Sequence, residues 1–222
     1  MIDEALSLIA PHYCCGCGQI GTLLCDNCKY DITYEQEHVC LVCKKPLATS
    51  GNCATCRLPY SAAWSVGERK DTLQRLIGLY KFRYAREAYK VLGTLLLETL
   101  PDLPANTVIV PIPTVTSHIR ERGYDHTLLI ADFVAKKRGL HLSQLLERKT
   151  RTIQRHASAA VRKKQARVAF APRRSIPLVD VPYLLIDDVA TTGSTLIYAA
   201  KALKEMGASQ VLVAVVAYQT LD

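Results

Sequence analysis

The hydrophobic pattern of the chain alternates between helix-like and strand-like stretches. Apolar positions at helical spacing predict helices over residues 71–100, over 127–137, and from Leu196 to about Met206. Short β-prone runs predict strands within the segments 57–70, 107–110, 140–146, 183–186 and 211–218. Strands that alternate with helices of these lengths indicate an α/β fold with a parallel sheet, in which binding sites lie at the carboxyl ends of the strands.

Proline and glycine positions agree with this division. Pro101 ends the first predicted helix, and Gly139 and Gly207 follow the other two as C-terminal caps. Residues 149–168 are polar and basic and lack a clean apolar period, so they are predicted to form a long mobile loop with some helix. A loop of that length in a compact domain is usually functional or disordered.

The segment YLLIDDVATTGSTL, residues 183–196, carries the most specific chemistry in the chain. Its apolar run ends in two adjacent acids, Asp187 and Asp188. Small and hydroxyl residues come next, including Thr191, Thr192, Gly193, Ser194 and Thr195. Backbone N–H groups at a helix N-terminus attract an anion, and carboxylates accept hydrogen bonds from ribose hydroxyls. The segment therefore predicts a site for a sugar phosphate.

The plainer interpretation of this segment is a helix N-cap followed by a Thr/Ser-rich turn. That interpretation accounts for one hydroxyl and one acid, but not for a pair of acids followed by a whole run of small and hydroxyl residues. A Walker-type loop is excluded, because no Gly-Lys-Thr or Gly-Lys-Ser follows a glycine-rich turn anywhere in the chain.

All nine cysteines lie between positions 14 and 56. Eight of them form four C-x-x-C pairs: Cys14 and Cys17, Cys25 and Cys28, Cys40 and Cys43, Cys53 and Cys56. Two such pairs supply a tetrahedral set of four thiolates, the structural geometry that Zn²⁺ prefers, so the chain predicts two zinc sites. The spacing favours sequential ribbons, the first two pairs together and the last two together. A cross-braced pairing, first with third and second with fourth, also fits the sequence.

Other ligands and other chemistries are less consistent with this region. Cys15 is the spare thiol, because only one residue separates it from Cys17, and His12 and His38 are expected at the surface since eight cysteines already fill two sites. Disulfides fit poorly with a chain that is expected to be cytoplasmic. An iron–sulfur site also needs four thiolates, but the paired spacing favours zinc.

Charge is distributed unevenly. Residues 136–174 contain thirteen Lys and Arg and one acid, Glu147, so this segment carries +12 within a chain of net charge +8. The remainder is therefore at −4, and a basic segment on a mildly acidic body predicts a polyanionic partner such as nucleic acid or pyrophosphate. Elsewhere, Lys81 and Arg83 flank Phe82 within a helical pattern, where Phe82 can pack while the two basic side chains face a ligand or solvent, with solvent as the default.

The length and composition indicate a globular protein. The 222 residues suffice for one full domain and a small one, and 49% of them are hydrophobic. No apolar run approaches the roughly 20 residues that span a membrane. The first residues, MIDEALSLIAPHYCC, have acids near the start and no basic leader, so they do not resemble a signal peptide and a cytoplasmic location is expected.

The acid pair and the loop Thr192-Gly193-Ser194-Thr195 resemble the signature of the type I phosphoribosyltransferases. Two further segments, VIVPIPTVTSHIRERGYDHTLLIA (108–131) and ERKTRTIQRHASAAVRKKQARVAF (147–170), narrow the resemblance when taken with the cysteine-rich head. The whole chain resembles the ComF family (ComFC/GntX-like competence proteins). This resemblance implies a double zinc ribbon over residues 1–58 and a domain of the type I phosphoribosyltransferase fold over 59–222.

The resemblance also implies roles for individual residues. The loop 191–195 would hold the 5-phosphate of phosphoribosyl pyrophosphate (PRPP), and Asp187 and Asp188 would face its ribose hydroxyls and act, with Arg148, as catalytic residues. The turn from Pro111 to Thr114 corresponds to the pyrophosphate loop. The remaining matched positions are Pro113, Arg120, Arg122, Gly123, Thr152, Gln154, Ser158 and Arg162.

Two departures from the family pattern leave their positions without an assigned role. The family usually has Asn-Gln after the Arg-Gly-aromatic element, whereas this chain has Asp125-His126. The family usually has Asn near the end of the second loop, whereas this chain has Gln165.

Three functions remain open at this level. The first is transfer of a phosphoribosyl group from PRPP, with Mg²⁺, to an unidentified acceptor. The second, implied by the family, is handling of incoming single-stranded DNA during natural transformation, with competence helicase or recombination proteins as partners. The third is PRPP sensing without turnover. Candidate DNA contacts are the basic residues Lys163, Lys164 and Arg167, and the stacking faces of Tyr13, Tyr30, Tyr34, Tyr60 and Trp64.

Overall fold

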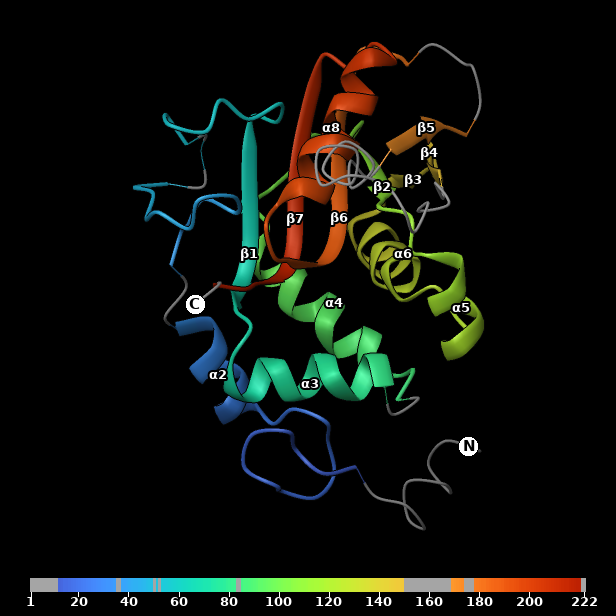
Figure 1. The fold of residues 1–222 in the computed structure, drawn as a ribbon. Coiled ribbons are helices and arrows are strands. Elements are labelled where there is room, and N and C mark those ends of the chain that lie inside the picture. The colour runs from blue at the N-terminus through green and yellow to red at the C-terminus, as the bar shows by residue number, and fades with distance from the viewer. Residues whose placement is uncertain are drawn as a thin grey trace, which may run out of the picture.

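The computed structural model describes residues 12–34, 37–49, 51, 53–82, 85–149, 169–173 and 178–220. At its centre lies a five-stranded parallel sheet (Figure 1). The strands, in their spatial order, are β1 (Ala62–Glu68), β7 (Gln210–Tyr218), β6 (Pro182–Ala190), β2 (Val108–Pro111) and β3 (His141–Leu142). The sheet confirms the predicted α/β class, and β7 lies inside it with β1 at the edge.

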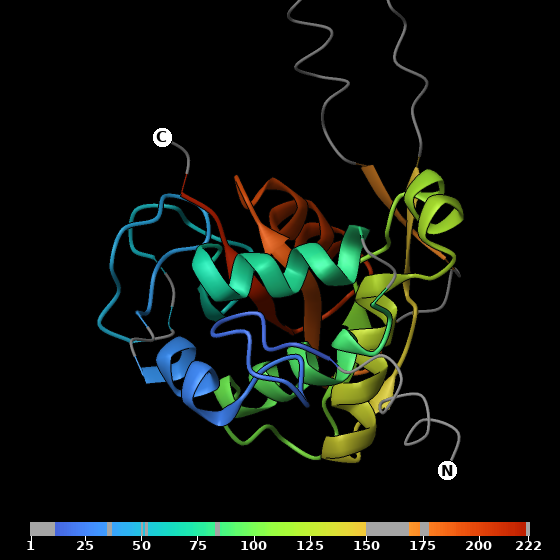
Figure 2. The same cartoon turned by 90° about the horizontal axis from the view of Figure 1, so that it is seen from below.

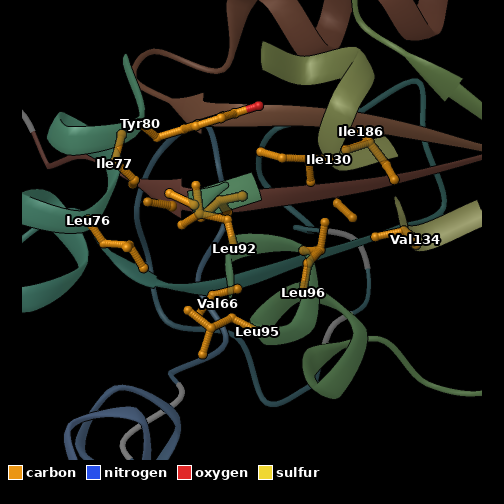
Figure 3. Close-up of a cluster of buried hydrophobic side chains, with 14 of the residues drawn as sticks. Val66, Leu76, Ile77, Tyr80, Leu92, Leu95, Leu96, Ile130, Val134 and Ile186 are labelled. Atoms are coloured by element: carbon orange, nitrogen blue, oxygen red, sulfur yellow. The ribbon is translucent and has the colours of Figure 1, made fainter. Parts of the chain in front are cut away.

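The two long central strands are buried on both faces, which explains their near-continuous apolar runs. Successive side chains of β6 alternate between two cores: Leu184 and Ile186 lie in one, and Tyr183 and Leu185 in the other. The first core contains α3 (Asp71–Phe82), α4 (Ala88–Thr99) and α6 (His126–Arg138), and Figure 3 shows their side chains converging. The second contains α8 (Ser194–Glu205).

The helix predicted over residues 71–100 is wrong as a single element, because the structure has two helices there. α3 ends at Phe82 and α4 starts at Ala88. The apolar periodicity is genuine in both halves, and each half buries its own stripe against the first core. A straight helix of that length would carry its second half away from the sheet, so the chain reverses between them.

The strand predicted over 140–146 is also wrong as a single element. β3 comprises only His141 and Leu142, and the chain then passes to β4 (Leu146–Lys149), which pairs antiparallel with β5 (Ala169–Pro172) in a separate two-stranded sheet. A short helix not expected from the sequence, α5 (Thr116–Arg122), follows β2 and ends at Gly123, whose positive φ of 79° suits glycine. The segment 150–168, predicted to be a mobile loop, lies outside the described residues.

The cysteine-rich head forms two ribbons that pack at different places (Figures 1 and 2). The first ribbon, residues 12–34, includes α2 (Asp26–Tyr34), and its Leu23 and Leu24 join the first core beside α3 and α4. In the second ribbon, from residue 37 to 57, Val39 and Leu41 join the second core beside α8. The apolar side chains of the head therefore continue into the cores of the sheet, and the domain boundary at residue 58 stays a prediction.

Candidate functional site

A cavity of about 320 Å³, here called the site cavity, opens beyond the carboxyl ends of β2 and β6. These strands are neighbours in the parallel sheet, and such an edge is the usual ligand site of α/β folds. The walls come from six separate parts of the chain. Among the lining residues are Arg69, Lys81, Phe82, Pro113, Thr114, Arg122, His126, Arg148, Asp187, Asp188 and Thr195.

The acid pair lies within β6, because the strand continues to Ala190, four residues beyond its predicted end. The Asp187 carboxylate accepts a hydrogen bond of 2.9 Å from the backbone N–H of Asp188. The Asp188 carboxylate accepts one of 2.6 Å from the N–H of Val189. These local bonds hold both carboxylates at the wall of the site cavity, beside the loop that follows the strand.

Asp188 is buried and joins a network of charged and polar groups. Its Oδ2 lies 2.5 Å from Nζ of Lys81 and 2.6 Å from Nε2 of His126. On the other side of the imidazole, Nη1 of Arg122 lies 3.0 Å from Nδ1 of His126. A guanidinium only donates hydrogen bonds, so Nδ1 accepts and the ring proton sits on Nε2, which donates to Asp188. His126 thus connects an arginine at one wall of the site cavity to an aspartate at another.

The two adjacent acids have opposite shifts in pKa. Burial disfavours ionisation of Asp188, but the His126 hydrogen bond and the charge of Lys81 outweigh it and hold the pKa of Asp188 well below its usual range. For Asp187, burial and the neighbouring charge of Asp188 raise the pKa above the usual range, with Lys81 and Arg148 opposing the shift. Asp188 is therefore the acid that keeps its negative charge, and Asp187 is the one that more readily holds a proton.

The site cavity favours anions. Arg69, Lys81, Arg122 and Arg148 all line it, four cations against two carboxylates. The guanidinium of Arg122 also lies over the ring of Phe82, 5.5 Å from its centroid, and Phe82 is 63% exposed. Because the neighbouring walls exclude part of the water, these charges act more strongly on a bound anion than they would in bulk solvent.

The sequence did not identify three of these residues as site residues. Lys81 was predicted to face solvent by default, and Arg69 was given no role. His126 was named only as a departure from the family pattern. The one usable signal was that departure, since a histidine beside an Arg-Gly element is able to bond both an arginine and an acid. Asp125, its neighbour, is the N-cap of α6 and accepts from the N–H of Leu128 and the hydroxyl of Thr114.

The hydroxyl-rich loop occupies residues 191–193, and α8 begins at Ser194, two residues before the predicted start. Gly193 is buried and has a positive φ of 70°. The hydroxyl of Thr192 donates to that of Ser194 at 2.9 Å, and Thr191, Thr192 and Ser194 are exposed. Thr195 lies in the wall of the site cavity. The N–H of Ser194 donates to the Thr192 hydroxyl at 3.3 Å, so hydroxyls and backbone N–H groups collect at this helix N-terminus.

The structure brings most of the predicted site residues together. Those in the cavity wall are Pro113, Thr114, Arg122, Arg148, Asp187, Asp188 and Thr195. Arg120 is exposed on α5 and does not line the site cavity. A neighbouring cavity of about 310 Å³ shares Pro113, Thr114 and Arg148 with it. The following predicted residues lie outside the described part of the chain: Thr152, Gln154, Ser158, Arg162, Lys163, Lys164, Gln165 and Arg167.

Two of the five aromatic residues proposed as stacking faces are not available. Tyr60 is only 2% exposed and belongs to the second core, and Trp64 on β1 packs against the first core. Tyr13, Tyr30 and Tyr34 are exposed, and the rings of Tyr30 and Tyr34 lie 5.0 Å apart between centroids.

The cysteines form two groups of four. The first cluster is Cys14, Cys17, Cys25 and Cys28, and the second cluster is Cys40, Cys43, Cys53 and Cys56. Two Sγ pairs in each cluster lie 3.6 to 3.8 Å apart, close to the separation of about 3.8 Å that sulfurs have around a tetrahedral Zn²⁺, and all four Sγ atoms of a cluster lie within 4.8 Å of one another. This donor set fits zinc, and the pairing is sequential rather than cross-braced. Cys15 lies outside both clusters, and His12 and His38 are exposed as predicted.

Residues 141–220 match the family model of the phosphoribosyl transferase domain. The chain is 27% identical over 216 residues to the DNA utilization protein YhgH of Salmonella typhi, an alignment that covers 86% of this chain and 94% of the relative. It is 26% identical over 213 residues to competence protein F of Haemophilus influenzae, covering 90% and 87%. For competence protein ComFC of Bacillus subtilis the identity is 25% over 200 residues, covering 83% and 79%.

The chain is similar to these competence and DNA utilization proteins over most of its length, which supports the predicted resemblance to the ComF family. Its fold is the type I phosphoribosyltransferase fold with two Cys₄ ribbons at the N-terminus, as the sequence predicted. Among solved structures it is similar to the glutamine PRPP amidotransferase of B. subtilis, with a TM-score of 0.39 and 22% identity over 57% of this chain. It spans about a quarter of that chain's length, since 25% of it is covered. Within the described residues, no helix of this chain is long and apolar enough to span a bilayer.

Proposed function

We propose that this chain binds the magnesium complex of PRPP in the site cavity, transfers its phosphoribosyl group to an acceptor and releases pyrophosphate. One observation carries the proposal: two carboxylates, the N-terminus of α8 and four cations surround a single cavity. PRPP has the matching pattern, because it bears a phosphate at one end, a pyrophosphate at the other and ribose hydroxyls between them.

The phosphate loop, residues 191–195, would hold the 5-phosphate. Gly193 is the N-cap of α8 and has no side chain, so a phosphate would approach the backbone N–H groups of the first turn without obstruction from a side chain there. The hydroxyls of Thr192 and Ser194, which bond each other in the structure, would turn to donate to phosphate oxygens.

The opposite pKa shifts of the two acids indicate that they would have different roles. Asp188 is held by Lys81 and His126, so its role is to position those two groups. Asp187 has the more adaptable carboxylate and would accept hydrogen bonds from the ribose hydroxyls. Mg²⁺ prefers carboxylate and phosphate oxygens, and when bound it would neutralise part of the pyrophosphate charge.

Arg122 and Arg148 would bind the pyrophosphate, with the turn at Pro113 and Thr114 between them. In the reaction, the bond from ribose C1 to the pyrophosphate oxygen breaks, its electron pair leaves with pyrophosphate, and the acceptor forms a new bond to C1. Positive charge develops on the ribose and negative charge on the leaving group. The arginines stabilise the latter, and His126 keeps Arg122 aligned through its Nδ1.

The decisive experiment measures pyrophosphate release from PRPP in the presence of Mg²⁺, over a panel of nucleobases, amines and DNA. We expect release in the natural chain and its loss in the double variant Asp187→Ala plus Asp188→Ala. The control is Asp132→Ala, which removes an acid that pairs with Lys136 on the surface of α6. If calorimetry detects binding of Mg-PRPP but no acceptor of the panel leads to pyrophosphate release, the result would instead support PRPP sensing. If folded, zinc-loaded protein does not bind Mg-PRPP, both transfer and sensing would be overturned.

A second function, handling of single-stranded DNA in the cytoplasm, is supported by the relatives named for DNA utilization and competence. The basic segment 136–174 provides the charge such a role needs. Neutralising Lys163, Lys164 and Arg167 with glutamine should weaken binding of an oligonucleotide and flatten its salt dependence. Neutralising the exposed residues Lys45, Lys70 and Lys201, which lie outside that segment, serves as a control of equal charge. Binding that is unchanged in about 0.5 M salt, roughly threefold above the physiological level of about 0.15 M, would contradict this role. Competence helicase or recombination proteins are the partners to test next.

A further inference from the structure

The second cluster lies directly against the phosphate loop. A Cβ atom added to Gly193 would come within 2.7 Å of Cγ2 of Val42 and within 2.8 Å of the carbonyl oxygen of Leu41. Leu41 and Val42 are the two residues between Cys40 and Cys43, so the tip of this knuckle touches the start of α8. Leu41 also shares the second core with Ala190 and Leu196, which bracket the phosphate loop.

Lys44 joins the same knuckle to the strand that leads into the loop. Its Nζ donates to the carbonyl oxygen of Leu41 at 2.8 Å and to that of Ala190 at 3.2 Å. Ala190 is the last residue of β6, and the loop starts at the next position. The Lys44 ammonium also lies 5.8 Å from the ring centroid of Tyr218, the residue paired with Ala190 on β7.

The backbone of Lys44 shows that this arrangement has a cost. Its φ is +60°, a left-handed conformation that is unusual for any residue with a side chain other than Asn or Asp. The equivalent position of the first knuckle is Gly18, with φ of +80°. Both residues donate an N–H bond of 2.9 Å to the first cysteine of their knuckle, so the two turns have the same hydrogen bond. Glycine would fit this turn without strain. Arg57, at the equivalent position of the last knuckle, also has a positive φ of +44°, so it is the contact of Lys44 with Ala190, and not the strained turn by itself, that connects the second cluster to the loop.

We propose that Lys44 is a positioning residue of the candidate PRPP site. Its ammonium ties the Ala190 carbonyl to the second knuckle and so holds the backbone from which the phosphate loop starts. The half-buried ammonium hydrogen-bonds two carbonyls, and such charge-assisted bonds are stronger than neutral ones. As far as a ligand is concerned, this inference rests on the proposed function, but the tie to the loop does not.

The test compares Lys44→Gly with Lys45→Ala. Lys44→Gly removes the ammonium and relieves the strained turn, whereas Lys45→Ala removes an equal charge from the exposed neighbouring residue. In Lys44→Gly we expect an unchanged or higher melting temperature and two zinc ions per chain. We also expect roughly tenfold faster amide exchange in a peptide spanning residues 189–197, the effect of losing about 1.5 kcal/mol of charge-assisted hydrogen bonding. Lys45→Ala should match the natural chain in all three measurements.

Binding supplies the second readout. Mg-PRPP and ribose 5-phosphate, which carries the 5-phosphate alone, should each bind roughly tenfold more weakly to Lys44→Gly, and Lys44→Arg should recover part of the loss. The inference would be overturned if the amides of the 189–197 peptide exchanged at the same rate in Lys44→Gly as in the natural chain. It would also be overturned if a fall in melting temperature accounted for the weaker binding. If the natural chain itself fails to bind Mg-PRPP, the proposed function fails, and the exchange comparison still decides the role of Lys44.

Discussion

The two Cys₄ clusters share one design but contact different parts of the molecule. The first cluster presses on a scaffold helix: Arg75 of α3 donates to the carbonyl oxygen of Cys15 at 2.6 Å, and Lys29 of α2 pairs with Glu98 of α4 at 2.5 Å. The second cluster presses on the phosphate loop through its own knuckle and Lys44. Two clusters with the same set of ligands therefore contact different parts of the molecule: the first contacts the helices of the fold, and the second contacts the candidate site.

Metal removal from one cluster at a time should give the largest effect. Cys17→Ser and Cys43→Ser change equivalent knuckle positions, and each should lose one zinc ion of the two. Structural zinc contributes roughly 10 kcal/mol or more to the folding of small ribbons, so both variants should melt at lower temperature. At a temperature where both remain folded, Cys43→Ser should lose Mg-PRPP binding and Cys17→Ser should keep it.

Zinc content, circular dichroism and calorimetry on the same samples make this comparison. Equal loss of Mg-PRPP binding in the two variants would show that both clusters act only through overall stability. The interpretation that the second cluster alone supports the candidate site would then be wrong.

A methyl group at the glycine facing each cluster should sharpen the comparison. Gly193→Ala places a Cβ 2.7 Å from Val42 at a positive φ, and we expect about 1–3 kcal/mol of destabilisation with loss of Mg-PRPP binding. Gly16→Ala places a Cβ 2.4 Å from Sγ of Cys28 and should disturb the first cluster instead. Chemical denaturation gives the stability, and calorimetry gives the binding. If the Gly193 variant binds normally, the knuckle does not constrain the phosphate loop.

The pH dependence of binding should belong to the site alone. The pKa of Asp187 is raised in the folded protein, so this acid takes up its negative charge only at higher pH than an ordinary aspartate, whose pKa is about 4. If ribose hydroxyls and Mg²⁺ need the carboxylate, the affinity for Mg-PRPP should rise as pH increases from about 4 through the raised pKa. Calorimetry in buffers of different ionisation heat should detect the released proton.

In Asp187→Asn this rise should disappear, while Cys17→Ser should retain it, because the first cluster does not face the acid pair. The raised pKa also means that the folded chain is less stable above the ordinary aspartate pKa than a chain with an unperturbed acid. Asp187→Asn should therefore be somewhat more stable at neutral pH. A pH profile that survives in Asp187→Asn would assign the titration to another group.

The smallest effect on stability is expected from the contact between α3 and the first cluster. Arg75→Ala removes the bond to the Cys15 carbonyl from an exposed side chain, which should lower the free energy of unfolding by about 1 kcal/mol. Mg-PRPP affinity should be unchanged within error. The matched change near the second cluster is Lys44→Gly, for which the opposite pattern is expected.

The sequence predicted the parts of this site better than their connections. The acid pair and the hydroxyl loop were found because they stand at the carboxyl end of a predicted strand, and parallel strands bring these ends to one edge. Arg148 was found from the family resemblance, and the structure places it within β4 of the separate two-stranded sheet. Lys81 was missed because its helix ends facing the cavity, which depends on the turn between α3 and α4. Arg120 was expected in the site, but it lies exposed on a short helix that no periodicity predicted.

Features that depend on residues close together in the sequence can thus be predicted from the sequence alone. Eight spaced cysteines indicate two metal sites, alternating apolar runs indicate a parallel sheet, and an acid pair before a hydroxyl loop indicates an anion site, because each signal depends on residues that are near in sequence. Tertiary packing alone decided that the second knuckle rests on Gly193, that Lys44 reaches Ala190, and that His126 connects Arg122 to Asp188. The Lys44 contact joins positions 146 residues apart, and side chains so distant meet only where the sheet and both cores place them.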